Sequence, residues 1–591
     1  MKATISLAII IIFILLSCNK QSNECIRINQ SGYRKGDIKV AVLLSNKQIN
    51  IKSFRIIDTN SGKTILISDA VIIKESLGPF KSCYRLSFTD LTKEGTYRIE
   101  AKGVVSPVFR ISDDVYDGGA DFMLNYMRQQ RCGYNPWLKD SCHIHDGYII
   151  YGGSSDYDHI DVTGGWHDAA DYLQYVATSA NATYQMLFAY SENPSAFSDD
   201  YLASGLPGKD GIPDVLNESR WGLDWLLKMN PAKGIMYNQI ADDRDHIGFR
   251  FPNMDTAYYG KGAERPVYRC TGKPQGLFRY TNRASGIAST AGKFASAFAK
   301  GAEVYKTTDP LFSELLVSKA VAAFIYGLKN PGACQTAPCG APYFYEEDNW
   351  NDDMELAAIE LFKITHEEKY LSYAADFGRK EPVTPWMGTD TARHYQWYPF
   401  VNMGHPAIAA HAGREDLKEE FLSNMKEGLD RIKRKGERNP FHIGVPFIWC
   451  SNNLVAATLT QADLYRRISG DSSFADLEAA HRDWLFGCNP WGTSMIVGLP
   501  GNGDYPENSH SSYVVKGEQV PGGLVDGPVY PTIFASLKGL YLSREDEYAQ
   551  FQTRLAVYHD DFADYSTNEC TMDGTACLIY YLSALQSKQT N

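Results

Sequence analysis

Short segments in which apolar and polar residues alternate run from residue 25 to residue 112, and turn residues separate them. A period of two is that of a β-strand with one buried face. The segments with this pattern cover residues 40–44, 54–57, 64–67, 83–88 and 96–99. Their lengths and spacing predict a small β-sandwich. Because this region carries no catalytic constellation, we interpret it as structural support, with carbohydrate binding as the alternative.

Long amphipathic stretches replace this pattern after residue 113. One of them opens at Pro213, with an acid in its first turn and leucines recurring on one side. Further stretches of this kind cover residues 286–306, 310–328, 350–362, 367–377, 415–435, 453–468, 473–486, 530–542 and 574–587. This succession predicts an all-α second domain. The long loops between the helices, rich in Gly, Pro, Trp and Tyr, are where we expect a functional site.

Length and charge restrict the class of protein. A chain of 591 residues exceeds what one hydrophobic core usually serves, so two domains are expected. The formal net charge of -12 argues against nucleic acid as a partner, whereas a neutral polymer is compatible with it. We expect a monomer.

The first residues have the pattern of an export signal. Lys2 precedes an apolar run over residues 5–16, which is too short for a comfortable membrane span, and the run ends at a Leu-x-x-Cys sequence similar to a bacterial lipobox. We therefore expect a signal peptide over residues 1–17, acylation of Cys18 and a polar tether over residues 18–24. An ordinary cleaved signal peptide is the alternative. The expected protein is an exported bacterial lipoprotein, held at the periplasmic or cell-surface face of the outer membrane.

The sequence Gly-Gly-Trp-His-Asp-Ala-Ala-Asp-Tyr at residues 164–172 brings candidate chemistry. The two glycines permit a tight turn, and the residues after them are compatible with the start of a helix. On a helix, Asp168 and Asp171 would share one face, beside an aromatic ring and an imidazole. Helix capping is the alternative reading of these carboxylates, and both can hold together because helix N-terminal amides also favour an ionised carboxylate.

A partner carboxylate stands near the other end of the chain. Glu569 lies between polar residues, an aromatic residue and the last apolar helix. In such surroundings a carboxyl group has a raised pKa and stays protonated, as a general acid must. A solvated glutamate at a helix start is the commoner alternative.

Several ordered motifs across the chain resemble glycoside hydrolase family 9, in the branch with an N-terminal immunoglobulin-like domain. The motifs cover residues 28–33, 39–42, 131–133, 164–171, 350–355, 449–452, 488–490, 494–498, 522–528 and 558–571. The resemblance spans nearly all of the chain after the signal. It departs from the family pattern at Ala170, which replaces a glycine, at Thr575, which replaces an asparagine, and at Ser512, where an arginine is usual.

The resemblance implies an immunoglobulin-like β-sandwich over residues 25–112 and an (α/α)6 barrel over residues 113–591. It further implies inverting cleavage of a β-1,4-linked glucan. In that reaction Asp171 would deprotonate the attacking water, Asp168 would help to hold the water, and Glu569 would protonate the departing oxygen. Inversion needs the two reacting carboxyl groups roughly 6.5–9.5 Å apart.

Sugar contacts are implied for several polar and aromatic side chains. His510 and Tyr565 would contact the sugar at the cleavage point, and the arginine missing at Ser512 leaves the preferred glucan open. The candidate stacking platforms, for each of which core packing is the alternative, are Trp166, Trp350, Trp397, Trp449 and Trp491.

A second constellation consists of Cys132, Cys142, His143 and His167. Two thiols and two imidazoles suit tetrahedral zinc, and a closed site would fix the turn that contains Asp168. A Cys132–Cys142 disulfide is the alternative, which export makes plausible. Structural zinc at such positions in this family branch favours the metal.

Calcium is also common in the family, and Asp214 and Glu218 are candidate ligands, with helix capping as the alternative. Cys334 and Cys339 flank a short loop and could form a disulfide.

Three functions are compatible with these observations. The first is an inverting endo-acting β-glucanase, and the second is an exo-acting glycosidase of the same fold. The third is a non-catalytic glycan-binding lipoprotein, against which the presence of both Asp171 and Glu569 speaks.

Overall fold

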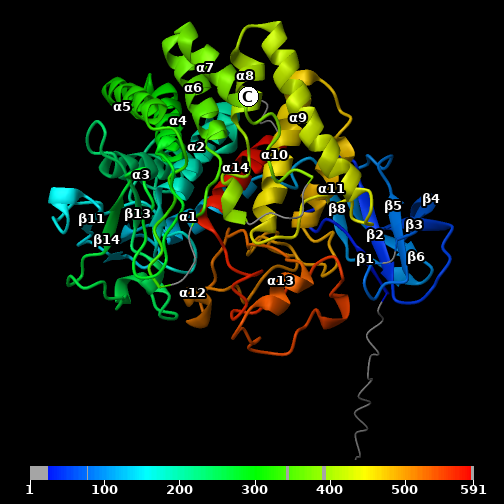
Figure 1. Ribbon diagram of the computed structural model, residues 1–591. Helices are drawn as coiled ribbons and strands as arrows, with labels where there is room; N and C mark the ends of the chain where they lie inside the picture. Colours follow the sequence, from blue (N-terminus) through cyan, green and yellow to red (C-terminus); the bar gives the residue numbers. More distant parts are fainter. Residues whose placement is uncertain (1–23, 76, 341–344, 389–393, 587–591) are drawn as a thin grey trace, which may run out of the picture.

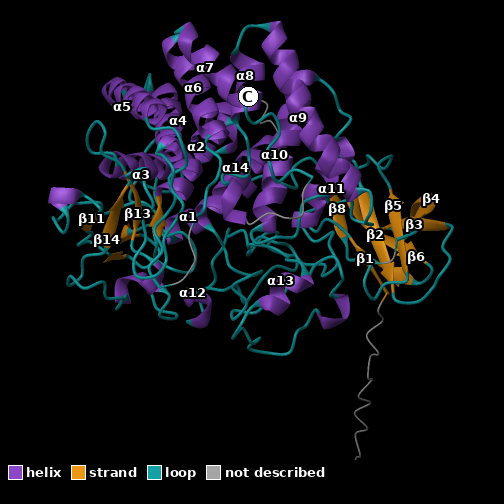
Figure 2. Cartoon of the chain, in the orientation of Figure 1, coloured by secondary structure: helices purple, strands orange, loops and turns teal. Residues whose placement is uncertain are grey.

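The computed structural model describes residues 24–75, 77–340, 345–388 and 394–586. A β-sandwich lies at one side of a large helical domain, and irregular loops cover one end of the helices (Figures 1 and 2). The predicted signal peptide and Cys18 lie outside the described residues. Glu24, expected at the end of the tether, is the first residue of strand β1.

The sandwich is antiparallel throughout, with strand order β1-β2-β5-β4-β3-β6-β7, and β8 pairs with β6. Strand β4 is long enough to pair with β3 through its first half and with β5 through its second half, which joins the two layers. The strands are β1 Glu24–Arg27, β2 Val40–Ser45, β3 Ser53–Asp58, β4 Thr64–Ile73, β5 Ser82–Ser87, β6 Gly95–Ala101, β7 Val104–Val105 and β8 Phe109–Ile111. The sandwich predicted from the period of two is confirmed.

The major helices follow in chain order and include those predicted from periodicity. They are α1 Gly119–Gln129, α2 Val176–Glu192, α3 Asp214–Met229, α4 Ala288–Tyr305, α5 Pro310–Lys329, α6 Asn351–Thr365, α7 Glu368–Gly378, α8 Gly404–His411, α9 Glu415–Gly436, α10 Ser451–Ser469, α11 Ala475–Leu485 and α14 Met572–Leu585. The stretch expected as a helix over 530–542 forms only the short α13, Pro531–Ser536, and α12 is Ser512–Val515. The end of the helix expected over 574–587 falls on residue 587, outside the described residues.

Neighbour relations among these helices define a closed barrel. Helices α2, α4, α6, α8, α10 and α14 each contact the next, and α14 returns to α2, so they form an inner ring. Helices α3, α5, α7, α9 and α11 each pack outside the inner helix that precedes them, and α1 packs outside α14. This is the (α/α)6 architecture. Helix α5 has the length and apolar composition of a membrane span, but here it packs as an outer helix against α4 and α6.

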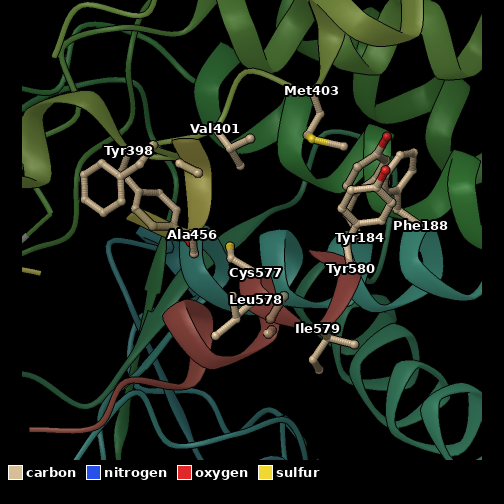
Figure 3. Packing of buried hydrophobic residues seen from close by; sticks show 14 of the residues in the cluster. Tyr184, Phe188, Tyr398, Val401, Met403, Ala456, Cys577, Leu578, Ile579 and Tyr580 are labelled. Atoms are coloured by element: carbon tan, nitrogen blue, oxygen red, sulfur yellow. The ribbon is translucent and has the colours of Figure 1, made fainter. Parts of the chain in front are cut away.

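The barrel centre is filled by apolar and aromatic side chains of the inner helices (Figure 3). Tyr184 and Phe188 of α2 meet Tyr580 of α14 there, and Phe188 and Tyr580 have ring centroids 4.9 Å apart. The Tyr184 hydroxyl donates to the buried carboxylate of Glu360 on α6 at 2.8 Å. Aromatic contacts and a satisfied polar group therefore join three inner helices across the core.

Polar contacts fasten the sandwich to the barrel. The Arg27 guanidinium donates to the Pro490 carbonyl at 2.7 Å, and the Asn29 amide donates to the buried carboxylate of Asp483 at 2.8 Å. Val42, Leu44 and other sandwich residues also belong to the large apolar core of the barrel. The sandwich is therefore a packed part of the molecule, consistent with structural support.

Small sheets lie among the loops at one side of the barrel (Figure 2). One sheet has the order β11-β14-β13-β12, and β9 pairs with β10. The strands are β9 Gly133–Asn135, β10 Asp140–Cys142, β11 Tyr148–Ile150, β12 Gln174–Tyr175, β13 Tyr237–Ile240 and β14 Pro266–Arg269. They order the long loops that carry the candidate site.

Candidate active site

Six long connections enter the inner helices, whereas the returns from inner to outer helices are short except for residues 193–213 between α2 and α3. This asymmetry places the long loops at one end of the barrel, over the N-termini of the inner ring. The connections concerned span residues 130–175, 230–287, 330–350, 379–403, 437–450 and 486–571. Every predicted catalytic residue lies in one of them.

The turn that contains Asp168 and Asp171 is not helical, so the predicted helix start there is wrong, and helix capping is wrong with it. The Asp168 N–H donates to the Leu173 carbonyl at 2.9 Å, and the Leu173 N–H donates to the Asp171 carboxylate at 3.0 Å. Gly165 has φ 69°, and a Cβ there would lie 2.7 Å from the Trp225 ring. The glycine turn is therefore required, but a hairpin-like loop rather than a helix brings the two aspartates together.

Asp168 is buried and fully engaged by hydrogen bonds. Its carboxyl group accepts from the Thr178 hydroxyl at 2.6 Å and from the Tyr345 hydroxyl at 3.2 Å. Burial and the charges of Asp573 and Asp171 raise the pKa of Asp168 well above its usual range. Asp168 is thus fixed in place as a neighbour of Asp171, and its contact with the attacking water stays a prediction.

Glu569 lies on an extended segment held between two others. The His510 N–H donates to the Asn568 carbonyl at 2.8 Å on one side, and the Asp526 N–H donates to the Glu569 carbonyl at 2.7 Å on the other. The Glu569 carboxyl group accepts from the Ala170 N–H at 3.0 Å. Because the donor is the backbone N–H of residue 170, this hydrogen bond does not depend on the side chain there, and the alanine that replaces the family's glycine preserves it.

Asp171 and Glu569 line one cavity of about 220 Å³, together with His246, Phe249 and His510. Burial and the charges of Asp526 and Asp171 raise the pKa of Glu569 well above its usual range. Asp171 and a carboxyl group with a raised pKa therefore share a cavity that opens to solvent. This is the arrangement that acid–base cleavage needs. The separation that inversion needs stays a prediction.

Asp171 has a cationic neighbour that the sequence analysis did not find. The His246 Nε2 lies 3.6 Å from the Asp171 carboxylate. Burial alone would lower the pKa of His246, but the hydrogen bond and charge of Asp171 raise it to about 10. The imidazolium thus stabilises a negative charge on Asp171 throughout the neutral range.

Asp526 gives a testable pH dependence. After burial, repulsion between the Asp526 and Glu569 carboxyl groups is the largest cause of the raised pKa of Glu569, and burial raises the pKa of Asp526 as well. Replacing Asp526 with asparagine should lower the pKa of Glu569, so Glu569 loses its proton at a lower pH. We expect the alkaline limb of kcat/KM for Asp526→Asn to move down by about 1 pH unit. Asp376→Asn, whose carboxylate is exposed on the outer helix α7, is the control, and an unmoved limb in Asp526→Asn would contradict the assignment of Glu569 as the acid.

Several aromatic side chains form a wall beside the cavity. The Tyr565 ring lies 5.8 Å from Trp449 and 6.0 Å from His510, and the Phe249 ring lies 4.7 Å from His510. Trp449, Tyr565 and His510 are all partly exposed. The structure therefore brings together three predicted sugar-binding residues and adds Phe249; their contact with sugar stays a prediction.

Trp166 is fully buried, with 0% exposure, and its indole N–H donates to Glu218 at 3.3 Å. A ring without an exposed face cannot stack on a sugar, so the prediction for Trp166 is wrong. Trp491 is buried at 2% and is excluded for the same reason. Trp350 and Trp397 are partly exposed, and their role stays a prediction.

The cavity is also lined by a residue from a loop that sequence reasoning missed. Arg250 lines the cavity, and its backbone N–H donates to the hydroxyl of Ser512 at 3.0 Å. Position 512 is the one where the family resemblance led us to expect an arginine. The only sequence signal was the density of charged residues over 242–255, which also fits a solvated loop.

Cys132, Cys142, His143 and His167 form one cluster, as predicted, with their donor atoms within 4.8 Å of one another. The His143 Nδ1 and the His167 Nε2 are 3.1 Å apart, and two thiol–imidazole contacts measure 3.9 and 4.0 Å. Donors around tetrahedral zinc are about 3.3–3.8 Å apart. Although burial opposes it, contacts with Cys142, His143 and His167 lower the pKa of the Cys132 thiol well below its usual range. The residues therefore fit a metal ion.

The alternative roles of cysteines and acids are not supported. Cys132, Cys142, Cys334 and Cys339 are all free thiols, so neither expected disulfide is present. The carboxylates expected to bind calcium are neutralised by arginines. Asp214 pairs with Arg128 at 2.9 Å, and Glu218 pairs with Arg131 at 2.6 Å. The calcium ligands predicted at these two positions are therefore wrong.

Two carboxyl groups that line one cavity, at the loop end of an (α/α)6 barrel, are the arrangement of an acid–base glycoside hydrolase. A model described as glycosyl hydrolase family 9 matches residues 116–582, and one described as a cellulase N-terminal ig-like domain matches residues 21–106. The chain belongs to glycosyl hydrolase family 9.

Individual relatives agree over nearly the full length. The chain is 26% identical to a cellodextrinase of Butyrivibrio fibrisolvens, over 94% of this chain and 99% of the relative. It is 24% identical to a xyloglucan-specific endo-β-1,4-glucanase of Bacteroides ovatus, over 89% and 90% of the two chains. A metagenome-derived family 9 endoglucanase of known structure is 25% identical, with a TM-score of 0.74 and coverage of 95% and 99%.

Proposed function

We propose that the protein is an inverting, endo-acting β-1,4-glucanase. The observation that carries the proposal is the cavity shared by Asp171 and Glu569, with a raised pKa on the glutamate. The name of the xyloglucan-specific endo-β-1,4-glucanase, which matches 89% of this chain, supports the substrate class.

The contacts assign each residue a step. Asp171, beside the His246 imidazolium, takes a proton from water, and that water attacks the anomeric carbon. Glu569 gives its proton to the glycosidic oxygen as the bond to that oxygen breaks. Attack on the face opposite the leaving group converts a β linkage into an α product. The wall of Trp449, Tyr565 and His510 holds the sugar beside them.

Product analysis on soluble β-glucans tests the proposal. Wild type should release oligosaccharides from cellulose derivatives, mixed-linkage glucan or xyloglucan, and Asp171→Ala and Glu569→Gln should not. NMR of the fresh product should show the α-anomer first. An initial β-anomer, or full activity in both variants, would refute the mechanism.

Hydrolysis of short oligosaccharides is the second candidate, because the cellodextrinase relative matches 94% of this chain. The two functions differ in how the polymer shortens. An endo-acting enzyme lowers the viscosity of a soluble glucan long before many reducing ends appear. An exo-acting enzyme releases small sugars with little early change in viscosity, and that result would select the second candidate.

We propose zinc as the metal of the cluster, because two thiols and two imidazoles in tetrahedral reach are its preferred donors. Zinc, when bound, supplies a fixed tie between the four residues and takes no part in proton transfer. Cys132 and His167 lie on the two chain segments that it would join. Metal analysis of the purified protein tests the identity of the ion.

We further propose that the protein is a monomeric lipoprotein of a bacterial outer membrane, anchored through Cys18 on its periplasmic or external face. The support is the sequence alone, an apolar run that ends in Leu-x-x-Cys. Labelled palmitate should enter the wild-type protein and not Cys18→Ala, which should move to the soluble fraction. Equal labelling of both would refute the anchor.

A further inference from the structure

Arg250 lies between the metal cluster and the turn that contains the catalytic base. Its guanidinium donates to the carboxylate of Asp255 at 2.5 Å and to that of Asp245 at 2.9 Å. It also donates to the Gly248 carbonyl at 2.9 Å. The side chain is only 12% exposed, so these three contacts fix its orientation.

On the side of the metal cluster, Asp255 connects Arg250 to His143. Its second carboxylate oxygen lies 3.0 Å from the His143 Nε2, while the His143 Nδ1 belongs to the cluster. A carboxylate on the far nitrogen of a metal-binding imidazole fixes the tautomer and the ring orientation. Arg250 therefore holds the group that orients a predicted metal ligand.

On the side of the catalytic turn, Asp245 and Tyr172 connect Arg250 to the residue that follows Asp171. Asp245 is fully buried and accepts the N–H of Tyr172, the residue that follows Asp171, at 2.8 Å. The Arg250 guanidinium lies over the Tyr172 ring at 4.8 Å, and the Tyr172 hydroxyl donates to the Arg250 carbonyl. Arg250 is thus connected to Tyr172 in three ways: through the carboxylate of Asp245, through its own guanidinium and through its backbone carbonyl.

We propose that Arg250 is a positioning residue that couples the metal cluster to the catalytic turn. The inference rests on the proposed function. A planar guanidinium with several fixed donors holds two separate carboxylates at once, which a lysine ammonium does not do in the same geometry. Loss of Arg250 would leave Asp245 and Asp255 as buried carboxylates without their shared cation. The orientation of His143 and the position of the turn at Tyr172 would then no longer be fixed.

Kinetics of Arg250→Ala and Arg250→Lys test the positioning role, with Arg279→Ala on an exposed neighbouring loop as the matched control. We expect kcat to fall about 10–100-fold in both Arg250 variants with KM changed less than about threefold. Millimolar guanidinium chloride should restore part of kcat in Arg250→Ala, and sodium chloride should not. Unchanged kcat with raised KM would show that Arg250 only binds substrate and would overturn the proposal. A loss of kcat without rescue by guanidinium would show general structural damage and would also overturn it.

Zinc affinity provides a readout that is independent of activity. Competition between a chelator and the protein, with zinc alone as the ligand, should show weaker binding by about tenfold in Arg250→Ala and in Asp255→Asn. Affinity equal to wild type in both variants would overturn the coupling. If wild type cleaved none of the glucans, the proposed function would fail, whereas the affinity change would still establish the connection between Arg250 and the cluster.

Discussion

Replacing Asp171 by asparagine is expected to lower kcat by a factor of about 10²–10⁴, the range of a lost general base. Asparagine has nearly the same shape and can still accept the Leu173 N–H, so the turn should keep its fold. The amide cannot take a proton from water, and the His246 imidazolium loses its counter-charge. Initial rates on a soluble β-glucan measure the effect, and an unchanged melting temperature within about 2 °C confirms that the fold is intact.

Azide distinguishes loss of the base from other damage in the Asp171→Ala variant. The smaller side chain leaves room in the cavity, and azide attacks the anomeric carbon without needing deprotonation. The bond from carbon to azide forms on the face that water would use, while Glu569 still protonates the leaving oxygen. We expect partial recovery of cleavage and an α-glycosyl azide as product. A β-glycosyl azide would contradict single-step inversion.

Replacing Cys142 by serine is expected to have the second-largest effect. Cys142 is a buried member of the proposed metal cluster, on a strand that pairs with the segment after Cys132. Without its sulfur, the proposed zinc would lose one of the four donors that join the 132–143 loop to the turn after His167. We expect loss of the bound metal and destabilisation on the order of 4 kcal/mol, the exceptional range that loss of a metal reaches. Metal analysis and thermal unfolding measure it.

The matched control for this variant is Cys577→Ser, because Cys577 is also buried but lies on α14 outside the cluster. It should keep the metal, although its buried environment makes some loss of stability expected. Treatment of wild type with a chelator should reproduce the Cys142→Ser result. A metal-free wild type with a Cys132–Cys142 bridge, found by mass spectrometry under non-reducing conditions, would contradict the metal assignment.

Sequence periodicity predicted the main strands of the sandwich, five of the six outer helices and four of the six inner helices; α1, α2 and α8 were missed. Helix α5 begins at Pro310 as expected, since Asp309 accepts the Phe312 N–H and proline suits the first helical position. Helix α2 was missed although it has 17 residues. It is buried nearly all round and has no polar stripe for periodicity to detect, although α4, an inner helix with similar burial, was predicted.

The site was predictable only in part. The residue types of Cys132, Cys142, His143 and His167 suggested a metal cluster, but their spacing is irregular, and the family resemblance was needed to favour a metal over a disulfide. Asp171 and Glu569 are almost 400 residues apart, and only the family resemblance paired them. The loop with His246 and Arg250 was missed because the role of these two residues depends on their contacts with Asp171, Asp245 and Asp255. No local sequence pattern predicts those contacts.

The last helix closes the inner ring by packing between α10 and α2. A chain synthesised from its N-terminus therefore cannot close the inner ring until α14, Met572–Leu585, has emerged. Glu569 directly precedes this helix, so the acid and the closing element arrive together. A molecule that stops before Glu569 lacks both, and hydrolytic competence is gained only after α14 has been made.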